Sequence, residues 1–293
     1  MNRTDVQRNF KDTVFRMLFR EKKNLLNLYN ALNRTTYTNT DDLEITTLEN
    51  AVYMNYKNDI SFVFDFELML YEHQSTYNPN MPLRDLLYVS SVLHNRVKNE
   101  NLYSKKLIKI PTPQFVVFYN GVDSQPEQQI LRLSDAFDKR QERPALELAV
   151  LVYNINLGHN QELLDTCCLL KEYAQYVEQV RTFAKEMSFA EAVEQAVEHC
   201  IRNGILSDFL SENRAEAIAV SIFEYDEEKH IQSERKEWRE IGREEGRVEG
   251  RGEGENKALQ LMQKLMDAGK AGEMKRALSD PAYRERLYRE YGQ

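Results

Sequence analysis

The chain has 293 residues, which exceeds one average domain, so we expect one globular body with an appendage. Its formal net charge of −8 and isoelectric point near 5.4 argue against a protein that binds nucleic acid by bulk charge alone. Its apolar runs are too short to span a bilayer, and the polar residues 1–10 are not typical of a signal peptide.

The N-terminal region predicts one amphipathic helix, because apolar residues recur at helical spacing from about residue 12 to residue 33. A polar interruption lies at residues 21–24, and a loop rich in Thr, Asn and Asp follows at 35–42. Asp12 stands near the start of this helix. It is either an acid favoured by the helix dipole or a member of a functional site.

Three strands are expected next, at residues 51–56, 60–64 and 68–71. The last two form a hairpin, which can bring Asp59 beside Glu72. Glu72 and Gln74 share one strand face, and His73 points to the other. Two adjacent carboxylates repel each other unless a proton or cation lies between them, and oxygen ligands suit Mg²⁺. The pattern therefore predicts a hydrolytic Mg²⁺ site, with ordinary turn chemistry as the alternative.

The middle of the chain predicts a helix at 83–99 after the break at residues 79–82, and then strands at 115–119 and 146–155. Strands separated by a helix favour an α/β fold with a mixed sheet flanked by helices. Between residues 84 and 109 the basic side chains outnumber the acidic ones, and they either contact nucleic-acid phosphates or form a solvated face. The basic residues are Arg84, Arg96, Lys98, Lys105, Lys106 and Lys109.

The last third is predicted to be helical from 162 to about 223, as a cap on the sheet or as a small subdomain. Glycines then recur every four residues from Gly242 to Gly254 within a charged stretch. Since each glycine weakens a helix, this stretch is either an oligomerisation stalk or hinge, or a solvated linker. Two short helices, 258–268 and 272–291, are expected after it.

The other side chains with chemical potential do not form recognisable sites. The three cysteines, Cys167, Cys168 and Cys200, lack metal-binding spacing and are typical of buried thiols in a reducing cytosol. The histidines show no zinc-ligand spacing, and no glycine-rich phosphate loop follows a strand. We therefore expect a cytoplasmic protein with no membrane segment and no nucleotide cofactor.

The string YEHQSTYNPNMPLRDLLY at 71–88, with KNDISF before it and PTPQFVVFYNG at 111–121, resembles the Rpn family of recombination-promoting nucleases and putative transposases. That family belongs to the PD-(D/E)XK nuclease superfamily, and the resemblance runs from about Lys11 into the tail. It implies a restriction-endonuclease-like fold and Mg²⁺-dependent cleavage of DNA phosphodiesters.

The resemblance also implies roles for individual residues. Asp59 resembles the first metal-binding acid, Glu72 the second, and Gln74 stands where the superfamily has lysine. Asp12 resembles an N-terminal acid that completes the site, and the backbone carbonyl of His73 would face the metal. An amide cannot carry the positive charge of lysine, so the metal alone, or Lys57 or Lys109, would have to supply it.

Four segments follow from these observations: a nuclease core at 10–160, a helical extension of it at 161–225, a charged glycine-repeat linker or stalk at 226–257, and a small helical segment at 258–293. The expected function is a Mg²⁺-dependent DNA endonuclease that promotes recombination or is associated with mobile elements, acting as a homodimer. DNA contacts are expected from Arg84, Arg96, Lys105, Lys106 and Lys109. The alternative is a weakly active or inactive nuclease-fold protein that binds DNA and self-associates through its tail.

Overall fold

The structure is a computed structural model that describes residues 14–47, 59–222, 247 and 256–291. The chain divides into two compact units, Met1–Asp226 and Glu227–Gln293. The first unit contains the sheet and every candidate site residue that the structure describes. Asp12, Lys57, the predicted strand at 51–56 and nearly all of the glycine repeat lie outside the described residues.

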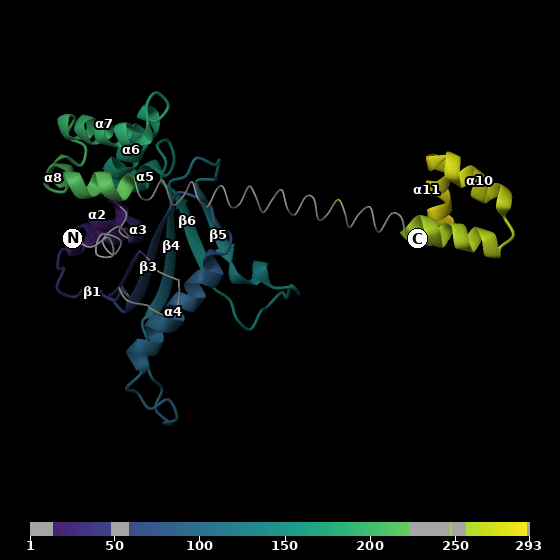
Figure 1. The fold of residues 1–293 in the computed structure, drawn as a ribbon. Helices are drawn as coiled ribbons and strands as arrows, with labels where there is room; N and C mark the ends of the chain where they lie inside the picture. Colours follow the sequence, from purple (N-terminus) through teal and green to yellow (C-terminus); the bar gives the residue numbers. More distant parts are fainter. Residues whose placement is uncertain (1–13, 48–58, 223–246, 248–255, 292–293) are drawn as a thin grey trace, which may run out of the picture. The chain divides into compact units, whose positions relative to one another are not determined.

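A six-stranded mixed sheet forms the centre of the first unit (Figure 1), in the order β1-β2-β3-β4-β6-β5. Strands β3, β4 and β6 run parallel, and the other neighbours are antiparallel. The predicted α/β class with a mixed sheet and flanking helices is therefore confirmed. The strands are β1 (Glu44–Ile45), β2 (Ile60–Phe64), β3 (Glu67–Gln74), β4 (Thr112–Tyr119), β5 (Gln128–Arg132) and β6 (Ala149–Asn154).

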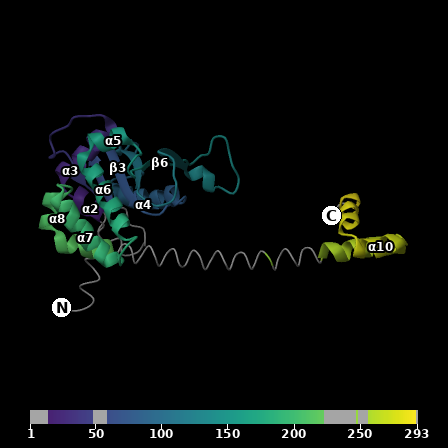
Figure 2. The ribbon, with the colours of Figure 1, turned by 90° about the horizontal axis from the view of Figure 1, so that it is seen from above.

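One face of the sheet is covered by helices from both ends of the first unit (Figure 1 and Figure 2). Phe62, Tyr71 and Phe118 point from the sheet into a core that these helices share. The helices of the first unit after residue 160 therefore cap the sheet. The helices on this face include α2 (Val14–Phe19), α3 (Lys22–Asn33), α5 (Gln161–Thr166), α6 (Cys168–Phe183), α7 (Phe189–Arg202) and α8 (Ser207–Glu212), and the helical residues 214–222 join the same core.

The N-terminal helix is divided in two, whereas the sequence predicted one helix from 12 to 33. Helix α2 ends at Phe19 and α3 begins at Lys22. The side-chain amide of Asn24 donates a 2.9 Å hydrogen bond to the carbonyl of Leu18, which satisfies an acceptor at the end of α2. The polar interruption in the sequence is therefore a break between two helices.

The other face of the sheet packs against α4 (Met81–Val97) and the short 3₁₀ helix η1 (Leu133–Ala136). Asn80 precedes α4 and its carbonyl accepts from the amides of Leu83 and Arg84, while Pro82 suits the first turn, where its missing N–H is not needed. Because strand side chains alternate, Leu68 and Leu70 point to α4, and Glu72 and Gln74 continue the same series.

Two strands of the sheet were not predicted. Strand β1 has only two residues, both exposed, and β5 alternates exposed and half-buried residues at the edge of the sheet. Neither has the buried apolar run on which strand prediction depends. The predicted strands at 115–119 and 146–155 correspond to β4 and β6, although β4 begins three residues earlier, at Thr112.

The second unit is a small helical body built from residues 256–267, α10 (Ala271–Ser279) and α11 (Pro281–Glu290). Leu261, Leu265, Ala277 and Leu287 form its core. The predicted helix at 272–291 is interrupted at Asp280, whose side chain accepts from the amide of Tyr283 and caps α11. Among the described residues of both units, no helix is long and apolar enough to cross a membrane.

Candidate functional site

The hairpin of β2 and β3 brings Asp59 and Glu72 together, as the sequence predicts. Ile60 is paired with Tyr71, so the next pair along the register is Asp59 and Glu72. The Asp59 carboxylate accepts a 2.8 Å hydrogen bond from the backbone amide of His73. This contact holds Asp59 at the end of β3, on the side of the sheet that faces α4.

The first turns of α4 supply the polar groups that face these carboxylates. Arg84 Nη2 lies 2.6 Å from Glu72 Oε1, in an ion pair in which the Glu72 side chain is only 10% exposed. The Gln74 side-chain amide points to Met81 Sδ at 2.6 Å, and Arg84 Nη1 lies 3.3 Å from the same sulfur. Arg84 therefore reaches the second acid, and Gln74 packs beside it.

Burial dominates the electrostatics of Glu72. Removal from water raises its pKa to about 8, Arg84 opposes this effect, and the charges of Asp59 and Asp85 raise the pKa further. At neutral pH the Glu72 side chain therefore favours a bound proton unless another positive charge comes close to it.

Asp85 is a member of this cluster that the sequence analysis missed. It is 4% exposed on α4, and burial raises its pKa to about 7, against the lowering effect of Arg84. The sequence contained a signal for this. Met81, Val89 and Val92 are four, four and seven residues from Asp85, so helical spacing places Asp85 on the same buried face of α4. An acid at a buried helix position marks a candidate site.

The His73 imidazole lies on the opposite face of β3, as the strand alternation predicts. Its ring is stacked on Phe15, with centroids 5.3 Å apart, and Nε2 lies 3.0 Å from the Tyr173 hydroxyl. Burial, with a contribution from the charge of Arg181, lowers its pKa to about 3. The side chain thus belongs to the core on the α2 and α6 side, and only its backbone adjoins the carboxylates.

The basic residues expected to contact DNA do not form one surface around the carboxylates. Only Arg84 lies beside them. Arg96 and Lys109 instead line a pocket with Phe66, at the β2–β3 turn and therefore at the opposite end of β3. Lys109 precedes β4 near Thr112, which is paired with Glu67, so it is remote from Gln74 and does not replace the missing lysine there.

Lys105 and Lys106 lie on the exposed loop between α4 and β4, beyond the C-terminal end of α4. They are thus close in sequence to the pocket residues Arg96 and Lys109, while Glu72 faces the first turns of the same helix. Asp12 and Lys57 lie outside the described residues, so their positions relative to Glu72 are not described.

The metal-binding capacity of the cluster depends on two acids. In the part of the chain that the structure describes, no three His, Cys, Asp or Glu side chains converge closely enough to hold a metal ion. Mg²⁺ is commonly bound by one or two carboxylates and keeps several waters. The oxygen donors of Asp59 and Glu72 fit such an ion, with Glu72 Oε1 held by Arg84 in this arrangement.

No family model matches the chain, and neither the curated proteins nor the solved structures contain a match to it. The resemblance to the Rpn nucleases consequently stays a prediction from the sequence.

Proposed function

We propose that the chain is a metal-dependent DNA endonuclease. The observation that supports this best is the pairing of β2 with β3, which sets the Asp59 and Glu72 carboxylates side by side beneath α4. In this proposal Asp59 and Glu72 hold a divalent cation, preferably Mg²⁺. When bound, such a cation polarises a phosphodiester and lowers the pKa of a water molecule.

The protein's own side chains would divide the remaining work. Arg84 orients Glu72 through their 2.6 Å ion pair and offers its other guanidinium nitrogens to a phosphate oxygen. The Gln74 side-chain amide, whose nitrogen points to Met81, orients the attacking water or a phosphate oxygen. Asp85 adds negative charge close to Glu72, which favours the presence of a cation there.

Nicking of supercoiled plasmid tests this function. The wild type should nick in Mg²⁺ and not in EDTA, and both Asp59→Asn and Glu72→Gln should abolish nicking. Glu67→Gln is a matched control, since Glu67 lies at the other end of the same strand and accepts a hydrogen bond from Tyr29 that an amide oxygen can also accept. Undiminished nicking by the Glu72 variant would refute the assignment.

A second candidate function is a DNA-binding protein that retains the nuclease fold without cutting. Two features favour it: Gln74 carries no charge, and Arg84 already occupies Glu72 Oε1, where a cation would bind. Metal-independent binding of DNA with no product after long incubation would support this reading. In both cases we propose a cytoplasmic homodimer, and the three cysteines, all free, are consistent with a reducing compartment.

A further inference from the structure

The turn between β2 and β3 has an unusual composition for its backbone. Phe64 is paired with Glu67, so Asp65 and Phe66 alone form the turn, with φ angles of 48° and 63°. A two-residue hairpin turn with both φ angles positive favours Asp-Gly or Asn-Gly. Here a phenylalanine occupies the position that suits glycine best.

The surroundings hold this strained turn in place. The amide of Thr112 donates a 2.9 Å hydrogen bond to the Phe66 carbonyl, and the Tyr37 hydroxyl donates a 2.8 Å hydrogen bond to the Asp65 carboxylate. The Phe66 side chain nevertheless remains 88% exposed. Strained residues held by their surroundings occur preferentially at ligand sites, and packing within the first unit does not explain this ring.

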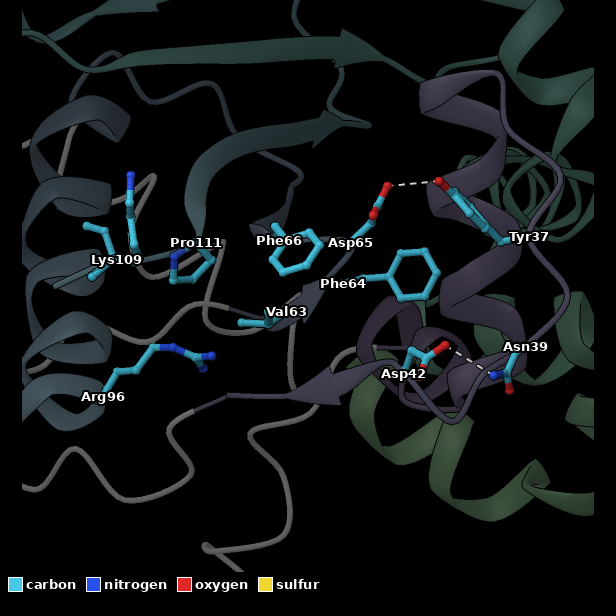
Figure 3. A pocket seen from close by; sticks show the side chains of 11 residues that line it. Tyr37, Asn39, Asp42, Val63, Phe64, Asp65, Phe66, Arg96, Lys109 and Pro111 are labelled. Atoms are coloured by element: carbon cyan, nitrogen blue, oxygen red, sulfur yellow. Dashed lines mark hydrogen bonds between the residues drawn. The ribbon is translucent and has the colours of Figure 1, made fainter. Parts of the chain in front are cut away.

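Phe66 lies at a pocket of about 560 Å³, which is within the usual range for small-ligand sites. Figure 3 shows that Arg96 and Lys109 lie on one side of Phe66, and that Tyr37, Asn39 and Asp42 lie on the other side. Val63, Phe64 and Pro111 lie between these two sides. The pocket therefore has a cationic side, an apolar middle and a side that accepts hydrogen bonds.

We propose that this pocket binds one nucleotide of a single-stranded nucleic acid, with its phosphate against Lys109 and Arg96 and its base stacked on Phe66. A nucleotide carries the three required features in the required order: an anion, a flat apolar ring and, on cytosine or adenine, an exocyclic amino group. Aromatic stacking and basic side chains are the usual means of binding single strands. Carboxylates accept from base amino groups.

The charges of the pocket fit a nucleotide better than they fit a simple anion or a simple cation, because one side of the pocket is basic and the other is acidic. Lys109 makes no ion pair among the described residues, and Arg96 shares only an exposed 3.3 Å pair with Glu44. On the other side, Asp42 accepts a 3.1 Å hydrogen bond from Asn39. Lys105 and Lys106, on the same exposed loop as Lys109, extend the basic side outwards for the neighbouring phosphates.

This site is separate from the carboxylate cluster. Six residues of extended strand between Phe66 and Glu72 span about 20 Å. A single-stranded nucleic acid that contacts both places would be held by the pocket about 20 Å from the point of cleavage. The pocket would therefore be an additional binding site of the proposed nuclease. The pocket does not depend on catalysis, because binding can be measured in EDTA, where the proposed reaction does not occur.

Fluorescence anisotropy of labelled oligonucleotides in EDTA tests the proposal. Wild type should bind oligo-dC and oligo-dA more tightly than oligo-dT, which lacks the amino group. Phe66→Gly should weaken binding about fivefold or more, the range expected for the loss of one stacked base. Its thermal midpoint should be no lower than that of wild type, because glycine adopts this φ without strain. Phe66→Tyr should retain binding.

Lys109→Ala should also weaken binding, and Lys139→Ala, at another exposed lysine, should not. Displacement of the labelled oligonucleotide by dCMP, at concentrations similar to those at which unlabelled oligo-dC displaces it, would show that the pocket binds a free nucleotide. Resistance to dCMP would show that the pocket requires a single-stranded nucleic acid. Unchanged affinity in both Phe66→Gly and Lys109→Ala would overturn the proposal, whether or not the wild type cleaves DNA.

Discussion

Acidification from pH 7.5 to 5 should remove about 2 kcal/mol of folding stability through His73 alone. The imidazole is buried between Phe15 and Tyr173, where burial and the charge of Arg181 lower its pKa to about 3. Its value in the unfolded chain is near 6.5. Between these two values the unfolded chain binds a proton that the folded chain does not, so stability falls as the pH falls. At pH 5, about 1.5 units below the unfolded value, the loss is roughly 2 kcal/mol.

The assay compares wild type with His73→Phe, which retains an aromatic ring beside Phe15. Because Glu72 and Asp85 have raised pKa values and titrate with the opposite sign, only the difference between the two proteins isolates His73. Urea unfolding of the first unit at pH 7.5, 6.5 and 5 should show that wild type loses about 2 kcal/mol more than the variant. Equal losses in wild type and His73→Phe would refute a buried, neutral His73.

Other substitutions test the carboxylate cluster and the end of β4. The stability that protonated Glu72 contributes is present below pH 4.5 and lost as the pH rises through about 8, so Glu72→Gln should be more stable than wild type by about 4 kcal/mol at pH 8, and by about 1 kcal/mol at pH 5, in urea unfolding. Asp85→Asn should show a smaller gain with the same sign, and a gain that does not change with pH would contradict the raised pKa. Gly121→Ala should destabilise by about 2 kcal/mol or more, because the new Cβ would overlap the carbonyl of Ser75. Gly272→Ala, whose Cβ meets open space in α10, should be neutral or stabilising by thermal unfolding, and similar effects at the two glycines would contradict the close packing at Gly121.

The hairpin of β2 and β3 was predictable because its information is local. Two buried apolar runs with a short turn determine the register, and the period of two then determines that Glu72 and Gln74 share a face while His73 points away. The relation between Asp59 and Glu72 follows from this pairing alone. No knowledge of the other strands was needed for that part of the site.

Asp85 and the basic residues depend on tertiary structure and were harder to predict. Asp85 belongs to the cluster only because α4 crosses the face of β3 that carries Glu72. Arg84 and Arg96 are on the same helix, yet twelve residues at 1.5 Å each separate them by about 18 Å. Closeness in sequence therefore suggested one basic surface where the fold makes two regions.

The sheet face under α4 carries acidic residues at positions where apolar side chains would also fit. Glu72 and Asp85 are buried and Asp59 is half-buried, and the Arg84 guanidinium pairs with Glu72. Apolar side chains of similar size at such positions are commonly as stable as buried ions or more so, and the neighbouring strand residues Leu68 and Leu70 show that this face accommodates them. Packing therefore does not account for three acids and an amide at the end of β3. The cation site that we propose would account for them, since function is the usual reason for a local cost in stability.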